Sequence, residues 1–242
     1  MPLTPVRVMR VLPKALHHDG ENDYVAGPDY IADWTHVETQ LTVEVLLRVW
    51  KYGSMVACFH GVNGEWQVRA WGGNIYFWIK WTDGTTSAVT AVQNYELGTW
   101  YHIAFTWRKG TYLKAYLYGK LVGSASVPDL HPWSYEPPLT IGAWRGGSGY
   151  FTKADFALVR VYTCELAESK IEHNFYHLND PVRDGLVLWL HWDSIDIDAG
   201  VWYDKSGYGN DGAIYGATLV DVIKKPVRIL SPPSRIISPP LR

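Results

Sequence analysis

The sequence WYHIAFTWR at residues 100–108, followed by KGT at 109–111 and YLKAYLY at 112–118, decides the fold. Its aromatic and β-branched residues are enriched in strands, and the Gly-containing connection between the two runs is typical of a hairpin. A third run, 120–125, begins directly after Gly119. We therefore predict three consecutive antiparallel strands in this part of the chain.

Further strand-like runs flank this hairpin on both sides. They share period-two alternation or β-branched composition, with Gly-containing turns between several of them. The predicted strands are 41–49, 55–60, 65–71, 74–81, 85–92, 139–142 and 155–162. Together with the hairpin, these runs predict an all-β fold.

One helix interrupts the series of strands. The segment 166–177 carries Leu166, Ile171 and Phe175, which we expect to point inward from a helix. Its start lacks a strong N-cap, because Ala167 stands where Ser would be expected. We therefore predict a single short helix.

Length and composition favour one large β domain with extensions over two domains. The chain has 242 residues, of which 47% are apolar, enough for a sizeable core. Its 13 Trp, 16 Tyr and 22 Gly are typical of many short strands with Gly-rich turns. Cys58 and Cys164 are too few for a disulfide framework, so a single pair and two buried thiols both stay open.

The sequence shows neither a membrane-spanning segment nor a signal peptide. No run of 18 or more apolar residues occurs, so we expect no membrane span. Residues 1–5, MPLTP, lack the charged and apolar regions that open a signal peptide.

The two ends of the chain are basic, and the region between them is acidic. Residues 1–16 and 222–242 contain basic residues and no acid, so all 24 acidic residues lie between them. This polarity favours docking of the ends onto the body of the same or another copy. The basic residues are sparse and interleaved with apolar ones, so we expect packing and no binding to nucleic acid.

The two basic ends also share a short sequence. PVRV at 5–8 recurs as PVRI at 226–229, and the tail continues with two Ser-Pro-Pro repeats. Proline removes a hydrogen-bond donor, so we predict edge strands or polyproline-like segments at these extended, Pro-rich termini. The residues expected to mediate assembly are Pro5, Val6, Arg7, Val8, Pro226, Val227, Arg228, Ile229, Ile236 and Ile237.

Several of these segments together resemble the laminin-G-like members of the concanavalin A-like lectin and glucanase superfamily. The matching sequences are DGENDYV at 19–25, LTVEV at 41–45, WYHIAFTW at 100–107, YLYGKLVG at 116–123, LTIG at 139–142 and VRVY at 159–162. The resemblance covers nearly the whole chain outside the tails and implies a two-sheet antiparallel jelly-roll sandwich. It is unspecific for function, because the fold carries lectins, adhesion modules, enzyme appendages and structural proteins.

The order of the segments departs from the family. Residues 185–221 resemble the opening of a laminin-G-like domain, yet here they come last. We expect this permuted segment to complete the sandwich of its own chain. The predicted organisation is a basic extension at 1–16, a sandwich at 17–221 and a basic Pro-rich tail at 222–242.

Patterns for catalysis are sparse. The retaining glycosidases of the superfamily carry closely spaced carboxylates on one strand, whereas Glu44 stands alone among its strand neighbours. No His-x-x-x-His or Cys-x-x-Cys spacing suggests zinc, and no phosphate loop or nucleophile elbow occurs. We therefore expect a protein that is not an enzyme.

Two acidic stretches offer oxygen ligands for calcium. The first set is Asp19, Asn22 and Asp23, and the second is Asp193, Asp196 and Asp198. Asp and Asn in Gly-containing turns also bond their own backbone, and we favour this structural interpretation. The family often carries an Asp before its closing strand, where this chain has FALV at 156–159, so we expect no cofactor.

The best surface candidate for a ligand is a set of aromatic and polar residues that alternate with apolar ones on three predicted strands. Such faces can stack on sugar rings while supplying hydrogen bonds. The same composition suits protein–protein contacts, so both interpretations stay open. The candidate residues are Arg69, Trp71, Asn74, Tyr76, Trp78, Lys80, Tyr112, Tyr116 and Tyr118.

These observations lead to three functional hypotheses. The leading one is a non-enzymatic structural or adhesion module that assembles with copies of itself, when a Pro-rich end adds a strand to a neighbour's sheet. It suits a subunit of a virion or cell-surface appendage, at an extracellular or surface location. The alternative is a monomeric lectin-like module for cell-surface glycans, and the third is a carbohydrate-active enzyme.

Overall fold

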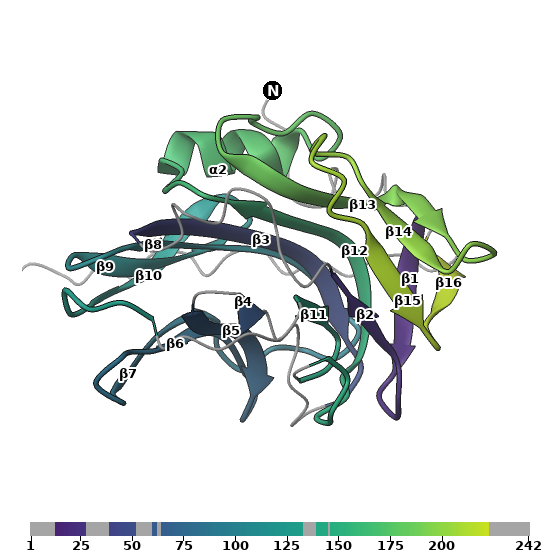
Figure 1. Cartoon of the computed structure of the whole chain (residues 1–242), viewed down its shortest axis with the longest axis horizontal. Coiled ribbons are helices and arrows are strands. Elements are labelled where there is room, and N and C mark those ends of the chain that lie inside the picture. Colours follow the sequence, from purple (N-terminus) through teal and green to yellow (C-terminus); the bar gives the residue numbers. More distant parts are fainter. Residues whose placement is uncertain are drawn as a thin grey trace, which may run out of the picture.

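The computed structural model describes residues 13–27, 39–51, 60–61, 64–132, 139–144 and 146–222. Within these residues the chain forms two antiparallel sheets, and one helix covers the larger sheet (Figure 1). The prediction of an all-β two-sheet sandwich with one short helix is confirmed, and the arrangement is consistent with a jelly roll.

The large sheet has twelve strands in the described part of the chain. They are β1 (Lys14–Asp19), β2 (Tyr24–Ala26), β3 (Gln40–Val49), β8 (Trp100–Arg108), β9 (Tyr112–Leu117), β10 (Lys120–Ser126), β11 (Thr140–Ile141), β12 (Lys153–Tyr162), β13 (Leu186–Asp196), β14 (Val201–Asp204), β15 (Gly212–Tyr215) and β16 (Thr218–Asp221). The main path runs in the order β10-β9-β8-β3-β12-β13-β14-β15-β2-β11. Off this path, β1 pairs with β12 and with β16.

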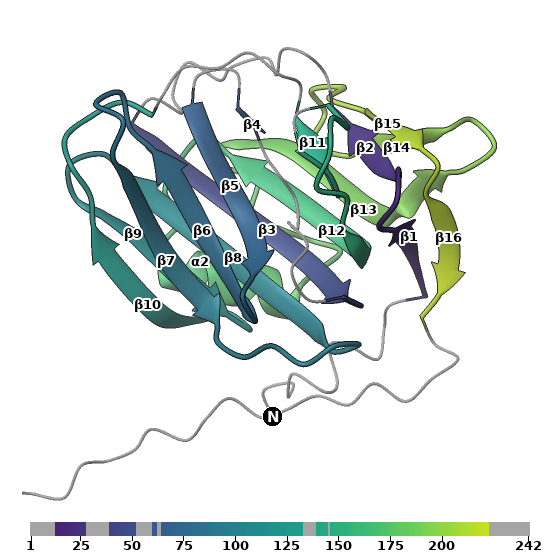
Figure 2. The same ribbon diagram turned by 90° about the horizontal axis from the view of Figure 1, so that it is seen from below.

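The small sheet lies under one half of the large sheet in Figure 1 and turns its outer face toward the viewer in Figure 2. Its strands, in order, are β4 (His60–Gly61), β5 (Gly64–Trp71), β6 (Asn74–Lys80) and β7 (Thr86–Val92). Because β7 contacts β9 and β10, the small sheet packs over that end of the large sheet.

The predicted hairpin at residues 100–118 forms β8 and β9 of the large sheet. β8 pairs with β9 in antiparallel register, and Thr111 N donates to Arg108 O at 3.1 Å in the connecting turn. On its other side β8 pairs with β3 along nearly its whole length. The aromatic and β-branched run that predicts the hairpin therefore also supplies an interior strand of the sheet.

The core between the two sheets is rich in aromatic rings. The Phe77 ring stacks on the Phe105 ring with centroids 5.3 Å apart, and the Trp81 and Trp107 rings lie 5.9 Å apart. All four side chains are at most 1% exposed. Burying a side chain of this size stabilises the fold by about 1.5–3 kcal/mol, so these contacts join the two sheets firmly.

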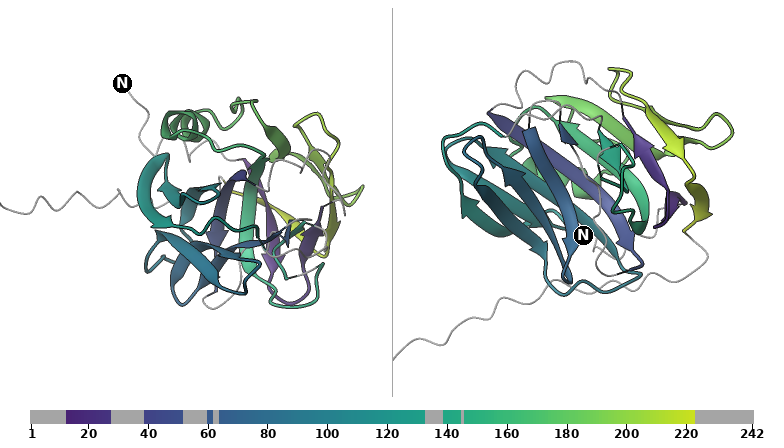
Figure 3. Two further views of the ribbon diagram at one scale, coloured as in Figure 1. Left: turned by 60° about the vertical axis from the view of Figure 1, so that its left-hand side comes forward. Right: turned by 60° about the horizontal axis from the view of Figure 1, so that its bottom comes forward.

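The helix α2 (Glu168–Tyr176) covers the opposite, outer face of the large sheet (Figures 1 and 3). Ile171 and Phe175 are fully buried against the sheet, and Leu166 just before the helix is 1% exposed, as predicted. Ala167 occupies the N-cap position and makes no side-chain cap hydrogen bond. Packing of one helix face therefore stabilises α2 more than its own ends do.

A buried polar network lies between α2 and the sheet. Arg160 NH1 lies 3.0 Å from Glu44 Oε2, and both side chains are completely buried. Asn174 Nδ2 donates to Glu44 Oε1 and to the Tyr162 hydroxyl, each at 2.9 Å. The guanidinium of Arg160 also donates to the carbonyl of Leu178. Burial raises the pKa of Glu44, while the charge of Arg160 opposes that change.

The segment 185–221, which the sequence predicts to be permuted, adds four strands to the large sheet of its own chain. β13 pairs with β12, β15 pairs with β2, and β16 pairs with β1. Val222 N donates to Pro13 O at 3.1 Å, so the described chain begins and ends side by side, as Figure 2 shows for β1 and β16. The domain boundaries at residues 16 and 221 stay a prediction.

Some predicted features fall outside the described residues. They include Cys58, most of the predicted strand 55–60 and all ten residues expected to mediate assembly. Cys164 is half-buried, its Sγ donates to the carbonyl of Asp184 at 3.4 Å, and burial raises the pKa of its thiol. Within the described ranges, no helix is long and apolar enough to cross a membrane.

Candidate functional site

The outer face of the small sheet brings together six of the nine residues predicted to bind a ligand. In β6 the inward Ile75, Phe77 and Ile79 are buried, so the four alternate residues from Asn74 to Lys80 face outward and are partly exposed. The register of β5 and β6 then sets the neighbours across the two strands. Arg69 lies opposite Tyr76, and Trp71 lies opposite Asn74.

The geometry of this face combines exposed rings with polar groups. The guanidinium of Arg69 lies 3.9 Å from the centroid of the Trp78 ring, and its Nε donates to Gln67 Oε1 at 2.6 Å. Trp71 is 51% exposed. A cation held over one ring beside a second, open ring offers stacking and hydrogen-bond donors together. We call Arg69, Trp71, Asn74, Tyr76, Trp78 and Lys80 the small-sheet face.

The remaining three predicted ligand residues lie on the other sheet. Tyr112 and Tyr116 face α2 from β9, and the Tyr112 hydroxyl donates to Glu165 Oε1 at 2.5 Å. Tyr116 is 2% exposed, and Tyr118 is 5% exposed, with its hydroxyl donating to the Trp100 carbonyl. Including Tyr116 and Tyr118 among surface ligands was therefore wrong, because strand alternation identifies a shared face but not what covers it.

The first predicted calcium set forms a self-contained turn. Asp23 Oδ2 accepts the backbone N–H of Asp19 at 2.7 Å, and Asp19 Oδ1 accepts the backbone N–H of Glu21 at 2.7 Å. Asp23 is 4% exposed, and burial raises the pKa of its carboxyl. These bonds match the structural interpretation of Asp19, Asn22 and Asp23, in which the side chains fix the turn.

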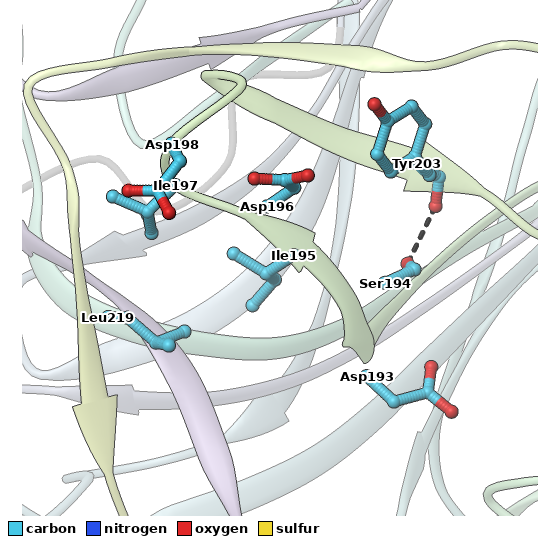
Figure 4. Close-up of a pocket in the computed structure, with 8 residues that line it drawn as sticks. All are labelled: Asp193, Ser194, Ile195, Asp196, Ile197, Asp198, Tyr203 and Leu219. Atoms are coloured by element: carbon cyan, nitrogen blue, oxygen red, sulfur yellow. Dashed lines mark hydrogen bonds between the residues drawn. The ribbon is translucent and has the colours of Figure 1, made fainter.

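The second acidic set lines a pocket of about 660 Å³ at the β13–β14 hairpin (Figure 4). The side chains of Asp193, Asp196 and Asp198 come from the end of β13 and the turn after it, and Ser194 Oγ donates to Tyr203 O at 2.7 Å. Although burial opposes it, hydrogen bonds from Lys205 and His191 hold the pKa of Asp193 below its usual value. Asp196 Oδ1 accepts the N–H of Ala199 at 2.9 Å. Among the described residues, no three His, Cys, Asp or Glu side chains are placed to hold a metal ion.

A second group of aromatic rings, two of them exposed, was not predicted from the sequence. It lies on the turn after β11 and on the neighbouring strands β2 and β15. Trp144 and Tyr150 pack edge to face with centroids 5.5 Å apart, and Tyr24 and Tyr215 stack 4.5 Å apart. The available signal was the glycine-rich run that separates Trp144 from Tyr150, which indicates a tight turn with an aromatic residue at each end.

Comparison with known proteins supports the fold. A sequence profile for the concanavalin A-like lectin/glucanases superfamily matches residues 19–172. No curated protein sequence matches the chain.

Three solved structures illustrate the similarity. A Bacteroides ovatus structure described as a candidate carbohydrate-binding protein has a TM-score of 0.60 and 16% identity, over 87% of this chain and 60% of that one. The binding domain of Paraclostridial Mosquitocidal Protein 1 has a TM-score of 0.54 and 16% identity, over 66% and 42%. The binding domain of botulinum neurotoxin DC, in complex with SialylT, has a TM-score of 0.51 and 14% identity, over 64% and 39%. The chain thus spans less than two thirds of each relative's length.

Proposed function

The chain belongs to the concanavalin A-like lectin/glucanases superfamily, and from this premise we propose that it is a non-enzymatic module that binds glycans on its small-sheet face. The observation that carries the proposal is an exposed ring, Trp71, on the same face as Arg69, whose guanidinium lies over the Trp78 ring. Sugars present apolar ring faces and hydroxyl groups, and aromatic rings beside hydrogen-bond donors recognise both. Two of the similar structures, the Bacteroides ovatus carbohydrate-binding candidate and the neurotoxin domain in complex with SialylT, support a carbohydrate as the ligand.

The absence of a catalytic role is part of the same proposal. Glu44 is fully buried under α2 and is committed to Arg160 and Asn174. A glycoside hydrolase needs two carboxyl groups about 5–10 Å apart beside the scissile bond. A carboxylate enclosed between the helix and the sheet cannot reach a polymeric substrate.

We expect Trp71→Ala to weaken glycan binding at least about tenfold, because an exposed ring that stacks on a sugar contributes at the level of an interface hot spot. The measurement is a glycan array with the full chain, followed by titration calorimetry with the strongest oligosaccharide. Tyr208→Ala is the matched control, because Tyr208 is similarly exposed, at 49%, on a different part of the surface. Equal affinities for Trp71→Ala and the unmodified chain would contradict the proposal.

Self-assembly is a second candidate function, favoured by one observation. The described chain begins and ends at the β1–β16 pair, so the basic segments 1–12 and 223–242 start from the same place. We propose that these two segments, each with a Pro-Val-Arg sequence, pair with a second copy. An extracellular, virion-surface or cell-surface location goes with this candidate and stays a prediction of the sequence.

Deleting residues 223–242 tests this candidate. We expect an oligomer before deletion and a monomer after it, because the deleted tail would supply the contact between copies. Sedimentation velocity at tens of micromolar protein measures both masses. A monomer in both samples would leave glycan binding as the function of a solitary module.

A further inference from the structure

We propose a second carbohydrate site, for a neutral pyranose, on the exposed rings around Tyr150. We define the Tyr150 cluster as Tyr24, Trp144, Tyr150, Phe151 and Tyr215. The inference shares its ligand class with the proposed function and rests on it in that respect, but it uses none of the same residues. The two sites can therefore be tested separately.

The Tyr150 cluster lies far along the large sheet from the small-sheet face. Its residues come from β2, from β15 and from the turn after β11, which are the last three strands at one end of the sheet order. The small sheet packs over β9 and β10 at the other end. Figure 2 shows β2, β11 and β15 beyond the edge of the small sheet. The two places therefore share no residue and no strand.

The turn after β11 brings the two ring pairs of the Tyr150 cluster next to each other. Tyr24 and Tyr215 are direct partners across β2 and β15, and their rings are within 9° of parallel. A Cβ added at Gly147 would lie 2.5 Å from the Tyr24 ring, so the backbone of the turn rests on that ring. The same turn carries Trp144 and Tyr150, whose rings lie at 87° to each other. The turn therefore joins the two ring pairs.

Backbone hydrogen bonds hold the turn in shape before any ligand arrives. Trp144 N donates to Gly149 O at 2.8 Å, Ser148 N donates to Trp144 O at 2.8 Å, and Thr152 N donates to Gly142 O at 2.7 Å. Rings fixed in this way lose little conformational entropy on binding, which favours affinity.

Folding alone does not account for the placement of Tyr150. Its φ is 51°, in the left-handed region that non-glycine residues rarely adopt. Tyr118 has the same φ of 51°, but its ring is 5% exposed and packs in the core, so burial compensates for the strain. Tyr150 is 56% exposed, and its ring packs edge to face on Trp144, so burial offsets less of its strain than it does at Tyr118. Strained residues of this kind cluster at functional positions.

The surroundings of the Tyr150 cluster select the kind of sugar. The turn at 19–23 lies beside Gly216, because a Cβ added there would lie 3.5 Å from Asn22 Oδ1. Asn22 and Glu21 are exposed and offer oxygen acceptors to sugar hydroxyls. Asp19 lies opposite Lys153, which offsets its charge, so Glu21 leaves only a weak negative charge that does not favour a sialylated or sulfated sugar. A neutral pyranose, with one apolar ring face and several hydroxyls, fits these requirements.

The test uses the full chain on an array of neutral and sialylated oligosaccharides. The variants are Tyr150→Gly, Tyr215→Ala and Trp71→Ala, with Leu121→Ala on the distant β10 as the control. Glycine tolerates positive φ, so Tyr150→Gly removes the ring without destabilising the turn. Thermal unfolding of each variant verifies that it is folded.

We expect Tyr150→Gly and Tyr215→Ala each to weaken binding of a subset of neutral glycans at least about tenfold, while signals that depend on Trp71 persist. Trp71→Ala should show the reverse pattern. If both tyrosine variants bind every glycan as the unmodified chain does, or if only sialylated glycans are lost, the second site is overturned. Losses in the tyrosine variants with none in Trp71→Ala would overturn the small-sheet face instead.

Discussion

Replacing Arg160 with Met lowers the free energy of unfolding by about 3–5 kcal/mol, the usual cost of removing one partner of a buried ion pair. Glu44 would be left completely buried without its cation, and the carbonyl of Leu178 would lose the donor that ties the chain after α2 to the sheet. Asn174 would still donate to Glu44, but an amide does not neutralise a carboxylate. The measurement is equilibrium unfolding in urea at pH 7.5.

The double variant Glu44→Leu with Arg160→Met is the matched control for charge. Removing both charges together is often close to neutral, so we expect the double variant to be more stable than Arg160→Met alone. A loss in the double variant equal to the sum of the two single losses would show that packing, and not the unpaired charge, explains the effect.

Acidification from pH 7 to pH 4 unfolds the protein, because three buried histidines must take up protons that the folded state excludes. Burial lowers the pKa of His18 to about 4, of His102 to about 3 and of His191 to about 4. In the unfolded chain each titrates near 6.5. Below that pH the unfolded state therefore binds more protons, and stability falls as the pH decreases.

The expected size of this effect is comparable to the whole stability of an ordinary domain. One unit of pKa depression corresponds to about 1.4 kcal/mol, so each of the three histidines removes about 3–5 kcal/mol once the pH is below its folded pKa. A domain of this kind is stable by about 5–15 kcal/mol in total. His17 acts in the opposite direction. Its hydrogen bond to Asp155 raises its pKa, so its contribution is present below about pH 6.5 and is lost as the pH rises through the folded value.

Urea midpoints at pH 7.5, 6.0 and 5.0 measure the acid dependence. Neither ring nitrogen of His102 has a hydrogen-bond partner, so His102→Leu should reduce the slope with little loss at pH 7.5. His131→Gln is the control, because His131 is exposed and its Nε2 lies 2.8 Å from Lys109 Nζ in the β8–β9 turn. A slope that His102→Leu leaves unchanged would mean that other groups cause the acid sensitivity.

The sequence predicted the fold well because its signal is local. The alternation in β6 predicted that successive residues from Asn74 to Lys80 point to opposite faces of the sheet, and the structure follows this residue by residue. The hairpin and the missing cap at Ala167 are equally short-range features. Such patterns predict a strand correctly in any sheet that has one buried face and one face toward solvent.

The candidate site was predicted only in part, because exposure depends on which layer lies above a face. Tyr116 satisfies the same alternation as Tyr76, yet α2 and Tyr162 enclose it, whereas the outer face of β6 stays partly open. The Tyr150 cluster was missed for a related reason. Tyr24 and Tyr215 are far apart in the sequence and meet only because β15 pairs with β2. Pairing between distant segments carries no local sequence signal.

The hydrogen bond between Val222 and Pro13 also determines how the molecule responds to mechanical load. Because β1 and β16 are antiparallel, with Lys14 opposite Asp221, Pro13 and Val222 lie at the same end of the strand pair. A pulling force between residues 13 and 222 would therefore open this pair one hydrogen bond at a time and would not shear the sheet. The other strands lie outside the path of the force, so the surfaces that carry the aromatic rings keep their shape while this pair opens.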